Sequence, residues 1–142
     1  MRRLVALLVV GLALASIAAG RSGDPALVVV VHPDRTDTLA IEDVRRIYLG
    51  QRRFWDDGSA IVALNLPSGS ALRERFSQRV LHADSAELTA YWNEQYFHGV
   101  FPPTVLSSSD AIKRYVASDP KAIGYLEASD VDATVRVVLP LE

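Results

Sequence analysis

The chain has 142 residues, of which 15 are Lys or Arg and 17 are Asp or Glu, so its formal net charge is −2. That balance lacks the excess of positive charge typical of nucleic-acid-binding domains, and we expect no nucleic-acid partner. The chain contains no cysteine, which excludes disulfide scaffolds and thiolate metal sites, so we expect its stability to come from a packed core.

The N-terminal 20 residues have the three parts of a secretory signal peptide. Arg2 and Arg3 give a positive start, the stretch from Leu4 to Ile17 is predominantly apolar, and small residues follow it. Cleavage is expected after Ala18 or Gly20, which would place the mature protein in the periplasm. An uncleaved anchor is the alternative, because a membrane-spanning helix needs about 17–25 apolar residues and this stretch is close to the lower limit.

The remaining residues, 21–142, are expected to form one domain. They are enough for a single hydrophobic core and too few for two. No internal repeat, low-complexity run or long linker interrupts them.

The first half of this domain predicts two strands that alternate with two helices. Residues 26–31 are a continuous aliphatic run rich in β-branched side chains, which is typical of a strand buried on both faces. A helix is expected from Thr38 or Ala40 to Tyr48, ending before a glycine. Residues 60–66 form a second apolar strand, and Ser70 is expected to cap a helix that runs to Leu81.

The second half predicts two more helices and three short strands. Asp84 and Glu87 have the spacing of a capping box at the start of a helix. A short strand over 104–106 and a helix capped by Ser108 or Ser109 follow, and closing strands are expected over 122–126 and 134–139. Strands separated by helices predict a layered α/β domain with right-handed crossovers.

Most of the large aromatic residues are expected in the core. Trp55 should anchor the Asp57-Gly58 turn against the core, and a place at a ligand or partner surface is the alternative. Four aromatic residues of the helix that follows Asp84 have helical spacing, which favours a place in the core. The alternative is that they form an exposed stripe for a partner. Phe97 and Phe101, near a Pro-Pro loop, can remain exposed. The four are Tyr91, Trp92, Tyr96 and Phe97.

Two segments carry residues in a specific order. The first reads Leu39-x-Ile-Glu-Asp-Val-Arg-Arg-Ile-Tyr-Leu-Gly50 and is followed by Trp55, Asp57-Gly58, Ile61, Gly69-Ser70 and Phe76. The second reads Tyr115-Val-Ala-x-x-Pro-x-Ala-Ile-Gly-Tyr125. Over roughly residues 28–126, this order resembles the periplasmic substrate-binding proteins of phosphate ABC transporters, which have the type II periplasmic-binding-protein fold.

The resemblance implies both a fold and a ligand. Full-length members have two lobes that close on phosphate, and this chain resembles only the second, so the expected fold is a single layered α/β domain like one lobe. The implied function is an exported module that binds phosphate or a related small oxyanion in connection with ABC-type phosphate transport. A transporter or another envelope protein is the implied partner.

The loop implied as the ligand site departs from the family pattern. Members place an arginine a few residues before a Ser-Gly-Thr that opens the helix. Here Leu66 stands at the arginine position, and Ala71 and Leu72 stand where glycine and threonine would be. Ser70 matches the family serine, with Gly69 before it.

Ser68, Gly69, Ser70 and Arg73 are therefore the candidate ligand-binding residues. Unpaired backbone N–H groups and the positive end of the dipole at a helix start favour an anion. Arg73 would supply the positive charge that Leu66 does not. The alternative is that Ser70 only caps the helix, a role that serine often fills, and that Arg73 belongs to a solvated face with its neighbouring arginines.

No arrangement of residues predicts catalysis or metal binding. His32, His82 and His98 are scattered and form no His-x-x-x-His pair. A Gly-x-Ser-x-Gly nucleophile motif is missing, and two adjacent carboxylates in a turn, Asp56 and Asp57, are normally solvated. We expect no enzyme, no cofactor and no metal.

Two functions remain open at this stage. The first is a solute-binding module for phosphate or a related oxyanion, favoured by the Gly69-Ser70 helix start. The second is a non-catalytic protein-interaction module, a lobe that has lost its ligand and binds a partner protein or another copy of itself. The residues at Leu66, Ala71 and Leu72 favour the second.

Overall fold

The computed structural model describes residue 23 and residues 25–141, so the expected signal peptide over residues 1–20 lies outside the described residues. The strands are β1 (Leu27–Val31), β2 (Val62–Asn65), β3 (Thr104–Val105), β4 (Ala122–Glu127) and β5 (Arg136–Leu141). The helices are α1 (Ile41–Tyr48), α2 (Ala71–Phe76), α3 (Ser85–Tyr96) and α4 (Ser109–Ser118). A π-helical turn, η1 (Ser77–Leu81), continues α2, and a 3-10 turn, η2 (Ala128–Asp130), follows β4. Within this part of the chain, no helix is long and apolar enough to cross a membrane.

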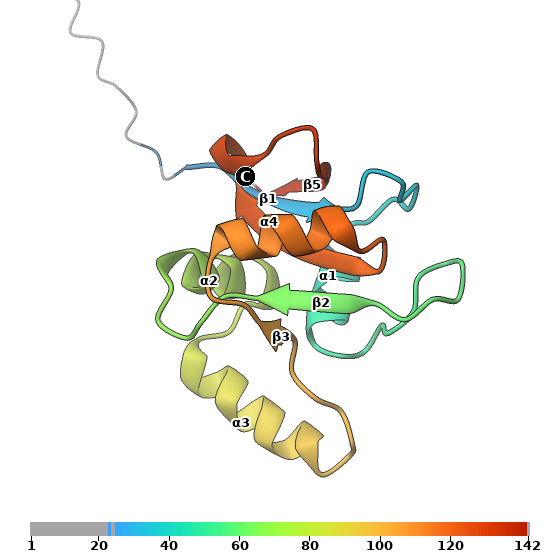
Figure 1. Ribbon diagram of the computed structural model, residues 1–142. Coiled ribbons are helices and arrows are strands. Elements are labelled where there is room, and N and C mark those ends of the chain that lie inside the picture. The colour runs from blue at the N-terminus through green and yellow to red at the C-terminus, as the bar shows by residue number, and fades with distance from the viewer. Residues whose placement is uncertain (1–22, 24, 142) are drawn as a thin grey trace, which may run out of the picture.

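The strands form one mixed sheet in the order β3-β2-β4-β1-β5 (Figure 1). β2 runs parallel to both of its neighbours, with Leu64 opposite Thr104 in β3. β1 runs antiparallel to both of its neighbours, with Val30 opposite Gly124 in β4. The predicted layered α/β domain is confirmed, and its antiparallel half was not part of the prediction.

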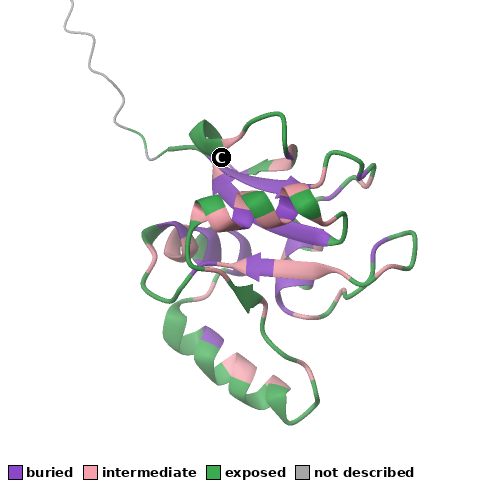
Figure 2. Ribbon diagram, viewed as in Figure 1, coloured by how far each residue is buried: buried purple, intermediate pink, exposed green. Residues whose placement is uncertain are grey.

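Helices cover both faces of the sheet, and β4 lies at the centre of the core. In Figure 1, α4 lies in front of the sheet, whereas α1 and α2 lie behind it. Alternate residues of β4 face the two layers: Gly124 lies against Ile112 of α4, and the Tyr125 ring stacks on Phe76 of α2 with centroids 4.0 Å apart. Every residue of β1 is buried, as predicted, and so are the first five residues of β4 (Figure 2).

The predicted starts of α3 and α4 are confirmed by side-chain hydrogen bonds. Asp84 accepts a bond from the Glu87 N–H at 2.9 Å, and Glu87 accepts one from the Asp84 N–H at 2.8 Å. The Ser108 hydroxyl caps α4 through the Ala111 N–H. Each cap satisfies a donor that would otherwise lack an intrahelical partner, so local sequence determines where these helices begin.

α3 projects away from the sheet (Figure 1) and contacts the residues that follow α1. The Tyr91 hydroxyl donates to the Leu49 carbonyl at 2.7 Å, and Leu88 is the buried residue of α3. The prediction that Tyr96 lies in the core is wrong, because 63% of it is exposed; Phe97, at 85%, is also outside the core. The helix rests on a loop rather than on the sheet, so only part of its apolar stripe is covered (Figure 2).

A buried arginine holds the turn that carries Trp55. Arg35 is only 8% exposed and donates to Asp37 at 3.1 Å, to Asp57 at 2.8 Å and to the Pro120 carbonyl at 2.7 Å. Its guanidinium lies 4.3 Å from the centroid of the Trp55 ring. Trp55 is buried in the core, as predicted. The burial of Arg35 was not predicted, because two of its partners, Asp57 and Pro120, come from parts of the chain far from it in sequence.

Asp57 is expected to make folding stability fall in acid. Hydrogen bonds from Ser59, and then from Arg35, lower the pKa of Asp57 from 3.8 to about 2. A carboxylate with a depressed pKa in the folded state stabilises the fold above its unfolded pKa, and that contribution is lost between about pH 4 and pH 2. Urea unfolding followed by tryptophan fluorescence over this range should show the loss. Asp57→Asn should make the pH dependence shallower; an unchanged slope would contradict the assignment.

Candidate functional site

The loop between β2 and α2 brings three of the four candidate residues to one pocket. Ser68, Gly69 and Arg73 line a pocket of about 300 Å³, which we call the Ser68 pocket. Its opposite wall is α3, through Ser85, Thr89 and Asn93, among other residues. Gly69 has a φ of +88°, a conformation that glycine adopts without strain, and this lets the chain turn sharply between the strand and the helix.

The fourth candidate, Ser70, is placed differently. Its hydroxyl accepts a hydrogen bond from the Arg73 N–H at 3.3 Å, so it caps α2. Ser70 is not among the residues that line the Ser68 pocket. This position agrees with the alternative that Ser70 caps the helix. The same hydrogen bond holds the backbone of Arg73 in the first turn of α2.

Arg73 carries positive charge to the end of β2. It is half-buried, and its Nη1 donates to the Leu66 carbonyl at 2.8 Å. Leu66 is itself buried, at the position where the family resemblance implies an arginine. The guanidinium of Arg73 therefore reaches the backbone of that position from the first turn of α2, with further N–H donors left for a ligand.

Two buried tyrosines hold the end of β2 beneath this loop. The Tyr48 hydroxyl donates to the Leu64 carbonyl at 2.9 Å. The Tyr125 hydroxyl donates to the Asn65 side chain and accepts a bond from the Leu66 N–H. Burial raises the pKa of both tyrosines, so their hydroxyls stay protonated and available as donors. They position Asn65, which lines the Ser68 pocket.

Glu74 is the residue of the Ser68 pocket that opposes an anion. Its side chain lines the pocket beside Arg73, and a carboxylate there repels a bound anion at short range. Asn65, Glu74 and the three polar residues of α3 were not predicted from the sequence. Of these residues, only Asn65 could have been noticed from the sequence, because it is a polar residue within the predicted apolar strand.

Among the residues that the structure describes, no three His, Asp or Glu side chains gather into a group that could hold a metal ion. The polar groups that line the Ser68 pocket are hydroxyls, amides, one guanidinium and the Glu74 carboxylate.

Solved structures similar to this chain include two that are described as proteins of phosphate transport. An ABC-type phosphate transport receptor from Vibrio cholerae matches 80% of this chain with 45% of its own, at a TM-score of 0.65 and 21% identity. A protein described as a phosphate ABC transporter substrate-binding protein, with bound phosphate, from Clostridium perfringens matches 80% of this chain with 44% of its own, at 0.65 and 24%. PstS from Borrelia burgdorferi matches 72% with 40% of its own, at 0.56 and 19%.

The comparison with protein-family models finds no match, and neither does the comparison with curated proteins. The chain spans less than half the length of the solved structures above. At identities of 19–24% the likeness concerns the fold. The described chain has the mixed α/β fold of one lobe of the substrate-binding proteins of phosphate ABC transporters.

Proposed function

We propose that this protein is an exported solute-binding module that takes phosphate or a related small oxyanion in the Ser68 pocket and works with an ABC-type phosphate transporter in the periplasm. The observation that carries the proposal is the position of Arg73. Its guanidinium lies in the pocket and reaches back to the Leu66 carbonyl. Ser68 and Gly69, from the loop in front of α2, line the same space.

The chemistry of these groups suits a small oxyanion. A guanidinium offers paired N–H donors whose spacing matches two oxygens of phosphate. Ser68 and Gly69 line the same pocket and add a hydroxyl and a backbone group, close to the partial positive charge at the start of α2. A structure with this fold, from Clostridium perfringens, holds phosphate. We expect weak binding, since the pocket is partly open and Glu74 opposes an anion.

Phosphate is expected to raise the unfolding temperature of the purified protein in a saturable way. A ligand at 100 times its dissociation constant adds about 2.7 kcal/mol to the free energy of unfolding, which corresponds to about 10 °C for a domain of this size. The measurement is thermal unfolding across a phosphate titration, with sulfate at equal ionic strength as the control. A larger shift with phosphate than with sulfate supports the proposal.

Variants of the pocket make the test specific. Arg73→Gln should remove most of the phosphate-induced shift, whereas Arg79→Gln, an exposed arginine outside the pocket, should leave it unchanged. Glu74→Gln should increase the affinity several-fold by removing a like charge. The compared quantity is the shift between ligand-free and ligand-bound protein, so a lower starting stability of Arg73→Gln does not affect the result. Equal shifts in all three variants would exclude the Ser68 pocket.

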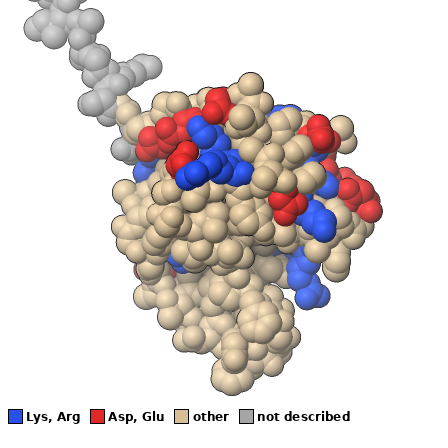
Figure 3. All heavy atoms as spheres, in the orientation of Figure 1, with Lys and Arg blue, Asp and Glu red and all other residues tan. Residues whose placement is uncertain are grey.

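A second candidate function is a protein-interaction module. It is favoured by three neighbouring aromatic residues beyond the core: Tyr96 lies edge-on to both Phe97 and Phe101, at centroid distances of 6.2 and 5.7 Å. On the face seen in Figure 3, the projecting part that α3 forms shows no charged side chains. Exposed apolar clusters of this kind often mark a protein interface. Failure of phosphate to shift unfolding, together with a dimer mass in light scattering that Phe97→Ser abolishes, would favour this function over anion binding.

A further inference from the structure

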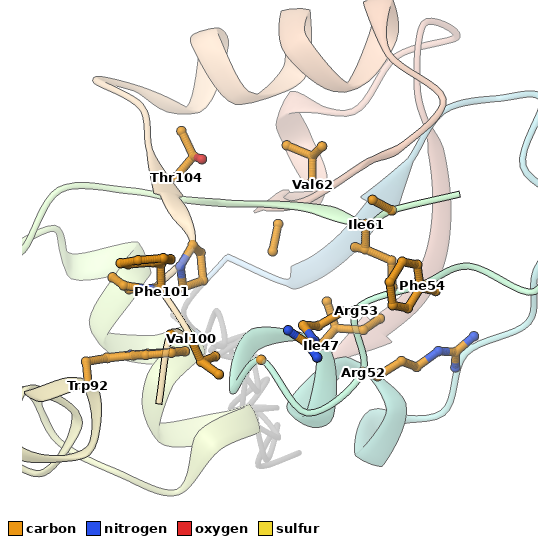
Figure 4. A pocket seen from close by; sticks show the side chains of 16 residues that line it. Ile47, Arg52, Arg53, Phe54, Ile61, Val62, Trp92, Val100, Phe101 and Thr104 are labelled. Atoms are coloured by element: carbon orange, nitrogen blue, oxygen red, sulfur yellow. The ribbon is translucent and has the colours of Figure 1, made fainter. Parts of the chain in front are cut away.

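A second recess, larger than the Ser68 pocket, opens on the other side of the segment between α3 and β3. It has a volume of about 440 Å³ and lies between the end of α1, the loop over residues 52–54, the start of β2 and residues 99–104 (Figure 4). We call it the Arg53 groove. Its volume is within the range of about 300–1,000 Å³ that is usual for small-molecule sites.

The walls of the Arg53 groove are mainly apolar and aromatic. Phe54 and Phe101 lie on opposite sides of it (Figure 4), and they remain 57% and 65% exposed. Ile61, on the side of Phe54, and Trp92, on the side of Phe101, add further apolar surface (Figure 4). Large apolar side chains that stay exposed around one recess are typical of a binding surface.

The charge in the groove has one sign. Arg52 and Arg53 line it, and none of its described lining residues is Asp or Glu. Arg52 is already paired, at 3.2 Å, with both Asp43 and Asp56. No ion pair of the described residues involves Arg53, and Figure 4 shows its guanidinium among the apolar side chains while Arg52 extends away from them. The groove therefore combines apolar walls with a cation that lacks a counter-charge within it.

The groove is held open by contacts at its base. Gly50 has a φ of +71°, and a Cβ at this position would lie 2.7 Å from Val100 Cγ1. Only glycine lets the segment before β3 approach α1 so closely. The bond from the Tyr91 hydroxyl to the Leu49 carbonyl fixes α3 beside the same point. These contacts position the base of the groove before any ligand arrives, which reduces the entropy cost of binding.

We propose that the Arg53 groove binds a small amphiphilic anion, a molecule with an apolar chain or ring and a single carboxylate. The apolar part lies between Phe54 and Phe101, and the carboxylate accepts hydrogen bonds from the Arg53 guanidinium. Arg53 is exposed, so a neutral molecule would leave its guanidinium to water and gain no ion pair, and a cation would be repelled by it. This ligand differs from inorganic phosphate, and its site is separate from the Ser68 pocket.

Calorimetric titration of the purified protein with decanoate, below its micelle-forming concentration, tests the proposal. Decanoate should bind saturably with one site per chain, decanol more weakly, and decyltrimethylammonium without detectable heat. Arg53→Gln should weaken decanoate binding roughly tenfold or more, the usual effect of losing a hydrogen bond to a charged group, with Arg79→Gln as the matched control. Phe101→Ala should also weaken it, whereas Phe97→Ala, outside the groove, should not.

Three results would overturn the proposal: no saturable binding of decanoate, equal affinity for decanoate and decyltrimethylammonium, or an unchanged affinity in Arg53→Gln. Since each of these variants alters an exposed side chain, we expect them to fold, and thermal unfolding without ligand checks this. Phosphate binding serves as an independent readout. Arg53→Gln should keep its phosphate-induced shift if the Ser68 pocket is the phosphate site, so the two proposals can fail separately.

Discussion

Replacement of Arg35 by alanine is expected to lower the free energy of unfolding by about 3–5 kcal/mol, the usual cost of removing one partner from a buried ion pair. The side chain of Asp37 is only 9% exposed, so the substitution leaves a carboxylate away from water without its cation. It also removes the donor to the Pro120 carbonyl and the guanidinium that covers Trp55. Urea unfolding followed by tryptophan fluorescence measures the loss without adding salt that screens charges.

Two controls separate burial from charge. Arg114 pairs with Asp110 at 2.7 Å on the surface of α4, with 76% of its side chain exposed, and Arg114→Ala should cost at most about 0.5 kcal/mol. Arg35→Lys should lie between the two, because an ammonium keeps the charge but cannot bind two carboxylates and a carbonyl in the planar geometry of a guanidinium. Equal losses for Arg35→Ala and Arg114→Ala would show that the Arg35 cluster does not stabilise the fold.

Gly124→Val is expected to destabilise the protein by about 3 kcal/mol, at the upper end for overpacked cores. A Cβ at Gly124 would lie 2.5 Å from Ile112 Cγ2 and 3.5 Å from Val116 Cγ2. β4 lies in the middle of the sheet and is bonded to β1 and β2, so neither the strand nor α4 can move away without breaking other contacts. Thermal or urea unfolding measures the effect.

A double-mutant cycle tests whether that clash is the cause. Ile112→Ala alone should cost about 2–5 kcal/mol by leaving a cavity. Combined with Gly124→Ala, it removes the side chain that the new methyl group meets, so the double variant should be more stable than the sum of the single losses by about 1 kcal/mol. Simple additivity would mean that the strand, rather than the contact with α4, determines the effect.

The parts of this fold that could be predicted are those set by neighbours in sequence. The Asp84–Glu87 box, the Ser70 cap and the continuous aliphatic run of β1 each act within a few residues, and all three are confirmed. The alternation of strands and helices, which predicted a layered α/β domain, also follows from such local patterns. The order of the strands in the sheet could not be predicted from local patterns. β1 pairs with β4 and β5, whose residues are about a hundred positions away in the chain.

The errors and omissions have a common physical origin. The helical stripe of α3 was correctly periodic, but Tyr96 is exposed because the helix packs on a loop and not on the sheet. Arg35 was overlooked because arginine is usually on the surface, and its burial depends on Asp57 and Pro120. Ser68, Gly69 and Arg73 were predicted as a group because they are neighbours in sequence; the structure places them around one pocket, and their binding of a ligand stays a prediction. The wall from α3 and the whole Arg53 groove arise from tertiary packing.

The two outer strands of the sheet have a consequence for how copies of the chain behave at high concentration. β5 contains Pro140, which has no N–H to offer to an added strand, and β3 contains only Thr104 and Val105. Neither border presents a long row of free donors and acceptors onto which another chain could be laid. The domain carries no disulfide to protect it, yet both borders resist the strand addition that starts fibril growth.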